Sequence, residues 1–194
     1  MTSFLSDFLV YVGRIREFTR RDWAVYLTWV GLMLGLVFST GGFVLFGHHH
    51  GVVFPDQVWL VPVGAAIFTL SISIDTIGHR TIYKEVLRQG EQLVHHVTIF
   101  CGIGSCVLLC AAYQSPQALW IPAMVLTVLS FVYSLIDEGF HWRRYMTQKS
   151  DRIEMWSHVG ILIGHSIMML AWWQWFFGGY QGVPQTLLAM RAGL

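Results

Sequence analysis

The chain has 194 residues, of which 55% are hydrophobic and only 12% are charged, and its formal net charge is +1. A soluble domain carries about twice that charged fraction, so the composition excludes a soluble globular protein and predicts an integral membrane protein surrounded by lipid. The length suits a single domain over residues 1–194, and we expect no nucleic acid among its partners.

The first predicted element, within residues 1–21, is an amphipathic helix that lies in the membrane interface. Apolar residues recur along it at helical spacing from Phe4 to Ile15, and its charged residues lie off that stripe. Five apolar runs follow within residues 22–177, each long enough to cross a bilayer as a helix: about 23–46, 58–78, 93–113, 119–136 and 155–177. The tail, 178–194, is expected to end in a short surface helix. The predicted fold is therefore all-α, with an N-terminal interfacial helix and five transmembrane helices.

Basic residues are distributed unevenly among the predicted loops. Of the 12 Lys and Arg residues, all but Arg191 lie before the first span, between the second and third spans, or between the fourth and fifth. Because cytoplasmic loops carry an excess of Lys and Arg, we expect the N-terminus in the cytoplasm and the C-terminus on the outer side.

A carboxylate and a histidine, four residues apart, mark one end of each of the last four spans. Residues at this spacing share one face of a helix. All four pairs fall on the predicted cytoplasmic side: Asp75 with His79, Glu91 with His95, Asp137 with His141, and Glu154 with His158.

The pairs also form an internal repeat, 71–100 and 133–163. Its first half has the pattern Asp-x3-His-x11-Glu-x3-His, and its second half differs by one residue in the connecting segment. This pattern indicates a duplicated helical hairpin. We expect the two copies, spans two to five, to pack as a four-helix bundle with a pseudo-twofold axis.

The residue types in this cluster point to metal chemistry. Carboxylate oxygen combined with imidazole nitrogen suits iron, manganese or zinc, and helix bundles hold metals with such side chains from facing helices. Charged groups inside a membrane usually have a specific partner, and two divalent cations would offset four carboxylates. We predict two metal ions, with iron favoured over manganese, zinc or copper, held within the set Asp75, His79, Glu91, His95, Asp137, Glu138, His141, Glu154, His158 and His165.

Some ligand assignments remain open. Asp137 matches the repeat, whereas Glu138 has the Glu-x2-His spacing of ferritin-like proteins, and His96 is an alternative to His95. Three roles fit His165: a further metal ligand, a residue that supports the ligands without binding the metal, or a hydrogen-bond partner of a neighbouring helix. The alternative to a metal site is a network of salt bridges between the carboxylates and the nearby arginines.

The histidine run at residues 48–50 lies on the predicted outer side, at the opposite end of the spans from the cluster. It cannot join the cluster without crossing the membrane. We expect it to have no catalytic role.

At these residues the sequence resembles, in a general way, the membrane-embedded di-metal oxygenases and desaturases, in which histidines at the cytoplasmic ends of a four-helix core hold two metals. The mixed carboxylate and histidine set is similar to that of soluble ferritin-like di-iron proteins, and the two Asp-x3-His segments resemble a helix pattern of copper membrane monooxygenases. These resemblances imply an oxidoreductase that acts on a lipid, isoprenoid or quinone from the bilayer. The sequence has no NAD, flavin or Fe–S motif, so electrons would come from an external donor.

Two other functions fit the same residues. Paired histidines on facing helices also ligate haem, with His96 and His165 as one such pair, which would make the chain an electron-transfer subunit. Intramembrane acids and histidines also form proton relays, in which case the chain would be a non-enzymatic subunit of a larger membrane complex.

Overall fold

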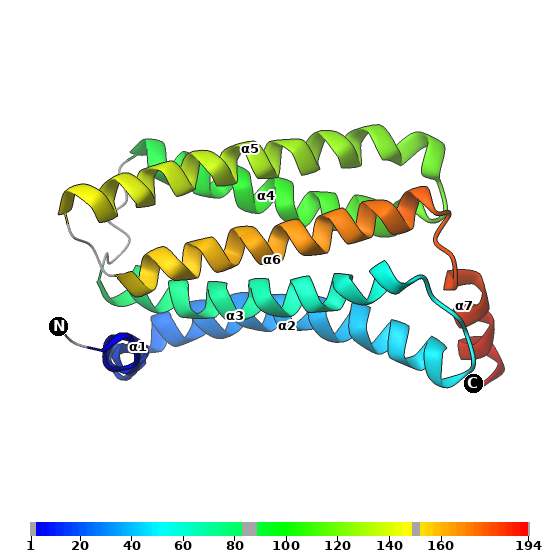
Figure 1. The fold of residues 1–194 in the computed structure, drawn as a ribbon, viewed down its shortest axis with the longest axis horizontal. Helices are drawn as coiled ribbons and strands as arrows, with labels where there is room; N and C mark the ends of the chain where they lie inside the picture. Colours follow the sequence, from blue (N-terminus) through cyan, green and yellow to red (C-terminus); the bar gives the residue numbers. More distant parts are fainter. Residues whose placement is uncertain (1–2, 83–88, 149–151, 194) are drawn as a thin grey trace.

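The computed structural model describes residues 3–82, 89–148 and 152–193, without the side chains of Gln89, Glu91 and Gln148. No strand occurs in these residues, which form seven α-helices and two short 3-10 turns (Figure 1). The helices are α1 (Phe4–Gly13), α2 (Arg20–His49), α3 (Leu60–Thr81), α4 (Gln89–Ala112), α5 (Pro116–Gln148), α6 (Arg152–Phe177) and α7 (Val183–Ala192). The all-helical prediction is therefore confirmed.

Among the described residues, five helices are long and apolar enough to cross a membrane: α2, α3, α4, α5 and α6. Their number and order agree with the five predicted spans. The largest difference is at α5, which continues from the predicted end near Ile136 to Gln148. Hydropathy detects only the apolar part of a helix, whereas main-chain hydrogen bonding continues into the polar part.

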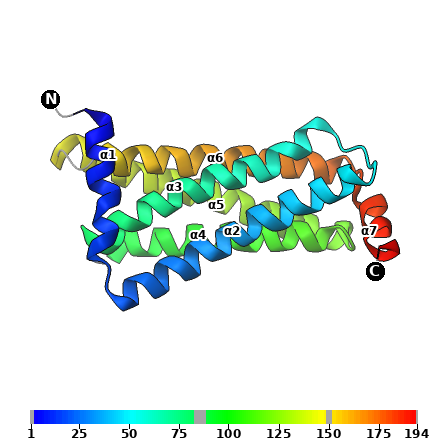
Figure 2. The ribbon, with the colours of Figure 1, turned by 90° about the horizontal axis from the view of Figure 1, so that it is seen from below.

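The N-terminal segment is shorter as a helix than predicted. α1 ends at Gly13, a poor helix former, and a 3-10 turn over Arg14–Glu17 follows. α2 then starts at a capping box, in which Thr19 and Asp22 bond each other's main-chain N–H groups. α1 lies across one end of the bundle, against the end of α3 and the start of α6 (Figure 2). We call this end of the molecule the α1 end and the opposite one the α7 end.

Helices that pack together in the bundle are not always neighbours in the sequence. α3 lies against α6 and α4 lies against α5, while α2 packs on the outer side of α3. In the described part of the chain, α4 makes no close main-chain contact with either α3 or α2. The bundle is therefore open along this edge, although α3 and α4 are consecutive in sequence.

Two glycines allow the closest helix crossing. A Cβ atom added to Gly64 of α3 would overlap the main chain of Met168, and one added to Gly164 of α6 would overlap the main chain of Phe68. Small residues let transmembrane helices approach to main-chain contact. This contact fixes how α3 and α6 sit relative to each other.

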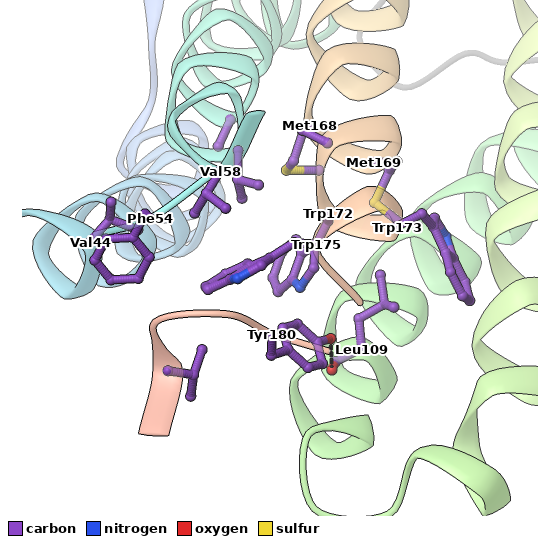
Figure 3. Close-up of a cluster of buried hydrophobic side chains, with 14 of the residues drawn as sticks. Val44, Phe54, Val58, Leu109, Met168, Met169, Trp172, Trp173, Trp175 and Tyr180 are labelled. Carbon is purple, nitrogen blue, oxygen red and sulfur yellow. Dashed lines mark hydrogen bonds between the residues drawn. The ribbon is translucent and has the colours of Figure 1, made fainter. Parts of the chain in front are cut away.

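A large apolar core fills the α7 end. It is rich in aromatic side chains, including Phe54, Trp172, Trp175 and Tyr180 (Figure 3). The Tyr180 hydroxyl donates a hydrogen bond of 2.5 Å to the main-chain carbonyl of Leu109, and the Trp175 indole donates to the carbonyl of Gln181. These bonds tie the segment before α7 to α4 and α6.

Candidate metal centre

Buried polar side chains gather at the α1 end, in contrast to the apolar α7 end. They come from α3, α4, α5 and α6, and three of the predicted pairs present both members to the interior of the bundle: Asp75 with His79, Asp137 with His141, and Glu154 with His158. Most are at least nine-tenths buried: Asp75, Asp137, His141, Glu154 and His158. Ionised groups are costly to bury unless they are paired or bind a metal.

One group of side chains could hold a metal ion between three helices. His79 of α3, His141 of α5, and Glu154 and His158 of α6 each offer one ligand atom, and these atoms all lie within 4.8 Å of one another. The rings of His141 and His158 are stacked with their centroids 3.5 Å apart.

A second group lies beside the first and shares one histidine with it. His95 of α4, Asp137 of α5 and His141 again place ligand atoms within the same 4.8 Å limit. Nδ1 of His95 lies 3.1 Å from Asp137 Oδ1, and Nδ1 of His141 lies 3.1 Å from Glu154 Oε1. A histidine that donates one ring N–H to a carboxylate is oriented to bind metal through its other nitrogen. Two groups that share a residue suit a centre with two adjacent metal ions.

Asp75 and Glu138 contact opposite sides of the same imidazole. His158 Nε2 lies 3.0 Å from Asp75 Oδ1, and His158 Nδ1 lies 3.4 Å from Glu138 Oε1. Within the described residues, Asp75 Oδ1 and His158 Nε2 are both buried and neither forms a hydrogen bond. Two buried atoms that are close but not aimed at each other suit joint coordination of an ion, so these residues fit a metal.

Arginines lie around the cluster and bear on the salt-bridge alternative. Arg80 donates to Asp22 of α2 at 2.7 Å, and Arg152 lies 2.6 Å from Asp7 of α1. Both carboxylates belong to the N-terminal part of the chain and not to the repeat. Arg144 lies 3.5 Å from Glu154 Oε1, so an arginine reaches the cluster at its edge. The contacts among the repeat residues are mainly between carboxylates and histidines.

His165 and His96 lie apart from the two groups. His165 is buried, stacks on the Phe131 ring at 4.5 Å, and has its Nε2 3.5 Å from the Ser130 hydroxyl. It thus contacts a neighbouring helix, one of the three roles expected for it. His96 is exposed on α4, so the structure does not bring His96 and His165 together as a haem pair.

The remaining predicted residues are placed as follows. The side chain of Glu91 lies outside the described residues, so its part in the cluster stays a prediction. The run at residues 48–50 ends α2 at the α7 end, far along the bundle from the cluster. Both Asp137 and Glu138 contact histidines of the cluster, so the structure brings both alternatives to the site.

A cavity of about 730 Å³ extends from the cluster into the bundle. Asp75, His79, His95, Asp137, Glu138 and His158 line one part of it. Apolar residues form most of the remaining wall, among them Leu36, Phe68, Ile99 and Met168. The volume lies within the range of cavities that hold one small organic ligand.

A buried polar stripe on α5 was not recognised from the sequence. It consists of Thr127, Ser130 and Ser134, which continue the line of Asp137 and His141 at spacings of three and four residues. Such spacing places all five on one helix face, and this was the signal available in the sequence. The stripe brings Ser130 to His165.

In comparisons with known proteins, no family model, no curated protein and no solved structure matches the chain.

Proposed function

We propose that the chain is a membrane-bound di-metal oxidoreductase that acts on a lipid-soluble substrate. The observation that carries the proposal is the pair of ligand groups that share His141, beside an apolar cavity. The α1 end, which carries nearly all the basic residues, would face the cytoplasm.

The charge of the site supports two cations. The described cluster contains four carboxylates, Asp75, Asp137, Glu138 and Glu154. Two divalent ions would balance these four negative charges while every histidine stays neutral. Without cations, the buried carboxylates would have to be offset by protons or by arginines such as Arg144.

The ligand types favour iron. Carboxylate and imidazole together suit iron, manganese or zinc, and no thiolate is present in the two groups. Of these metals, iron combines such ligands with oxygen chemistry in helix bundles. Copper, which prefers fewer carboxylates, fits less well.

The proposed reaction is hydroxylation or a related oxidation. A substrate C–H bond and dioxygen, with two electrons and two protons from outside the chain, would give an alcohol and water. The metal ions would supply the oxygen chemistry when bound. The chain would orient the substrate through the apolar wall, exclude water from the cavity and hold the ligands through the carboxylate–histidine contacts.

The fold supports a pseudo-twofold relation between the two halves of the repeat. An axis that exchanges α3 with α5 and α4 with α6 also exchanges the α3–α6 pair with the α5–α4 pair, and these are the two extensive helix pairs of the bundle. We propose that the cluster lies near this axis, so that each half supplies part of both metal sites.

Elemental analysis of detergent-purified protein, with a visible spectrum of the same sample, tests the proposal. The outer histidine run could bind metal adventitiously, so the reference protein carries His48→Ala, His49→Ala and His50→Ala. We expect two iron ions per chain in this reference and loss of one of them on Glu154→Ala, because Glu154 belongs to one of the two groups. A reference without stoichiometric metal would refute the proposal, and a Soret band would favour a haem subunit.

A second candidate is a proton relay, which the polar stripe of α5 favours. The Trp173 indole donates to the Thr127 hydroxyl at 3.1 Å, and Ser130 connects the same face to His165. This line of polar groups leads from the cluster toward the α7 end. Proton flux into vesicles by metal-free protein, lost on Asp75→Asn and Ser130→Ala, would favour this function. Partners of a larger complex would then be sought by mild co-purification.

A further inference from the structure

The cavity beside the cluster has an open side between α2 and α4. We propose, on the basis of the proposed function, that a single-chain lipid of one leaflet enters sideways through this gap, and that the atoms next to its head group reach the metal centre. We call this gap, lined by Gly31 and Gly35 of α2 and Gly102 of α4, the glycine portal.

The packing of the helices leaves the side of the cavity between α2 and α4 open. α2 and α4 both line the cavity, yet these two helices make no close main-chain contact in the part of the chain that the structure describes. Both are candidate membrane spans with mostly exposed apolar surfaces. The gap between them therefore faces the hydrocarbon of the bilayer and not water.

The portal glycines differ from the glycines that hold helices together. A Cβ atom added to Gly31, Gly35 or Gly102 would meet no atom within 4 Å. At Gly64 and Gly164, by contrast, the same atom would overlap a neighbouring main chain. The portal glycines therefore border open space, and a larger side chain at any of them would narrow the gap without disturbing a helix contact.

The depth of the cavity matches one leaflet. Along α2 its lining runs from Val25 to Leu36, about 16 Å at 1.5 Å per helical residue. The hydrocarbon core of a bilayer is about 30 Å thick, so the cavity covers about half of it. An occupant of this length is one lipid chain that keeps the orientation it has in its own leaflet.

The position of the polar groups sets which atoms of the lipid would react. Asp75 and His158 are each at least nine-tenths buried and line the cavity, and within the described residues Asp75 Oδ1 and His158 Nε2 form no hydrogen bond. They lie toward the α1 end, whereas Met168 and Leu36 line the deeper part. A lipid that slides in without turning over places its head group beside the cluster and its chain end in the deeper, apolar part.

Photolabelling in phosphatidylcholine vesicles tests the portal, with a hexadecanol that carries a diazirine in its chain as the probe. Met33 and Phe38 of α2 are the two positions compared. Met33 lines the cavity and is 6% exposed, and Phe38 is 70% exposed on the lipid-facing surface. We expect label at both positions in the wild-type protein, because only entry into the cavity brings the probe to Met33.

Variants of the portal separate entry from binding at the surface. Gly35→Leu combined with Gly102→Leu should abolish label at Met33 and leave label at Phe38 unchanged. The matched control is Gly42→Leu, since Gly42 is an exposed glycine of α2 outside the cavity whose Cβ also meets no atom. It should keep both labels, and Gly35→Leu alone should reduce label at Met33 if the double variant fails to fold.

The outcomes separate the portal from the proposed function, because iron is measured in every sample. Absence of label at Met33 in the wild type, or its persistence in folded portal variants, would overturn the portal even if iron is bound. Label at Met33 that is lost in the portal variants of iron-free protein would support the portal and count against the oxidoreductase.

Discussion

Gly164→Ala tests whether the contact between α3 and α6 sets the geometry of the metal centre. Gly164 faces the main chain of Phe68, and a Cβ added to it would overlap the main-chain N of Phe68 and lie 2.8 Å from its Cα. Ordinary contacts of a Cβ begin at 3.4 Å, so the two helices would have to separate by about 1 Å. Main-chain atoms cannot move aside as a side chain can.

This displacement has two expected consequences. Overpacking of a close contact costs about 1–3 kcal/mol, which should lower the thermal midpoint of unfolding. The separation also acts on Asp75 of α3 and His158 of α6, which now lie 3.0 Å apart. Metal sites tolerate displacements of only about 0.5 Å, so we expect iron affinity to fall by about tenfold or more.

Gly160→Ala is the matched control, one turn away on the same helix. Its added Cβ would meet the Ser71 hydroxyl, which can rotate away, and would lie 3.1 Å from the Ser71 Cβ, which needs to move by only a few tenths of an ångström. The cost should therefore be smaller than that of Gly164→Ala. Thermal unfolding in detergent and titration of the metal-free protein with ferrous iron measure both effects. Equal stability and equal iron affinity of Gly164→Ala and Gly160→Ala would refute the reasoning.

Four further variants test other parts of the structure. His141→Ala should lower the iron content more than His95→Ala, as measured by elemental analysis, because His141 can ligate one ion and also contacts Glu154 of the first group; equal losses would contradict the central position of His141. Gly78→Ala should displace α1, since the added Cβ would overlap the Tyr11 hydroxyl, and limited proteolysis should then cut the N-terminal segment faster than in wild type. Burial raises the pKa of Tyr180 above its ordinary value of 10.0, so its contribution to stability is present below about pH 10 and is lost as the pH rises further. Tyr180→Phe should cost about 1 kcal/mol at neutral pH through the lost hydrogen bond, and its unfolding midpoint should fall less steeply than that of wild type above pH 10.

The number of membrane-spanning helices could be predicted because each needs a long apolar run, and hydropathy measures this directly. Helix ends were less predictable, as the polar extension of α5 and the early end of α1 at Gly13 show. The neighbours of each helix could not be predicted. The repeat relates α3 to α5 and α4 to α6, but symmetry does not say which helices touch, and the contact at Gly64 and Gly164 joins residues that are far apart in sequence.

The candidate site was more accessible from the sequence than the packing, because a spacing of four residues fixes which side chains share a helix face. The spacing could not decide whether Asp137 or Glu138 belongs to the site, because the two residues are adjacent and both contact histidines of other helices. The sharing of His141 between two groups was also beyond sequence reasoning, since it depends on how α5 is rotated about its axis. His165 lies on the expected face, but its contacts with Ser130 and Phe131 follow from the α5–α6 crossing.

The α7 end stabilises the fold, whereas the α1 end holds the candidate metal centre. At the α7 end, the aromatic core and the bond from Tyr180 to Leu109 hold α3, α4, α6 and α7 together without ionised groups. At the α1 end, buried carboxylates repel one another, and among the described residues α4 makes no close main-chain contact with α3 or α2. Without a bound cation the α1 end would therefore be the less stable of the two. Metal binding should stabilise this end selectively, and amide hydrogen exchange of α4 near His95 should slow on iron binding more than exchange near Leu109.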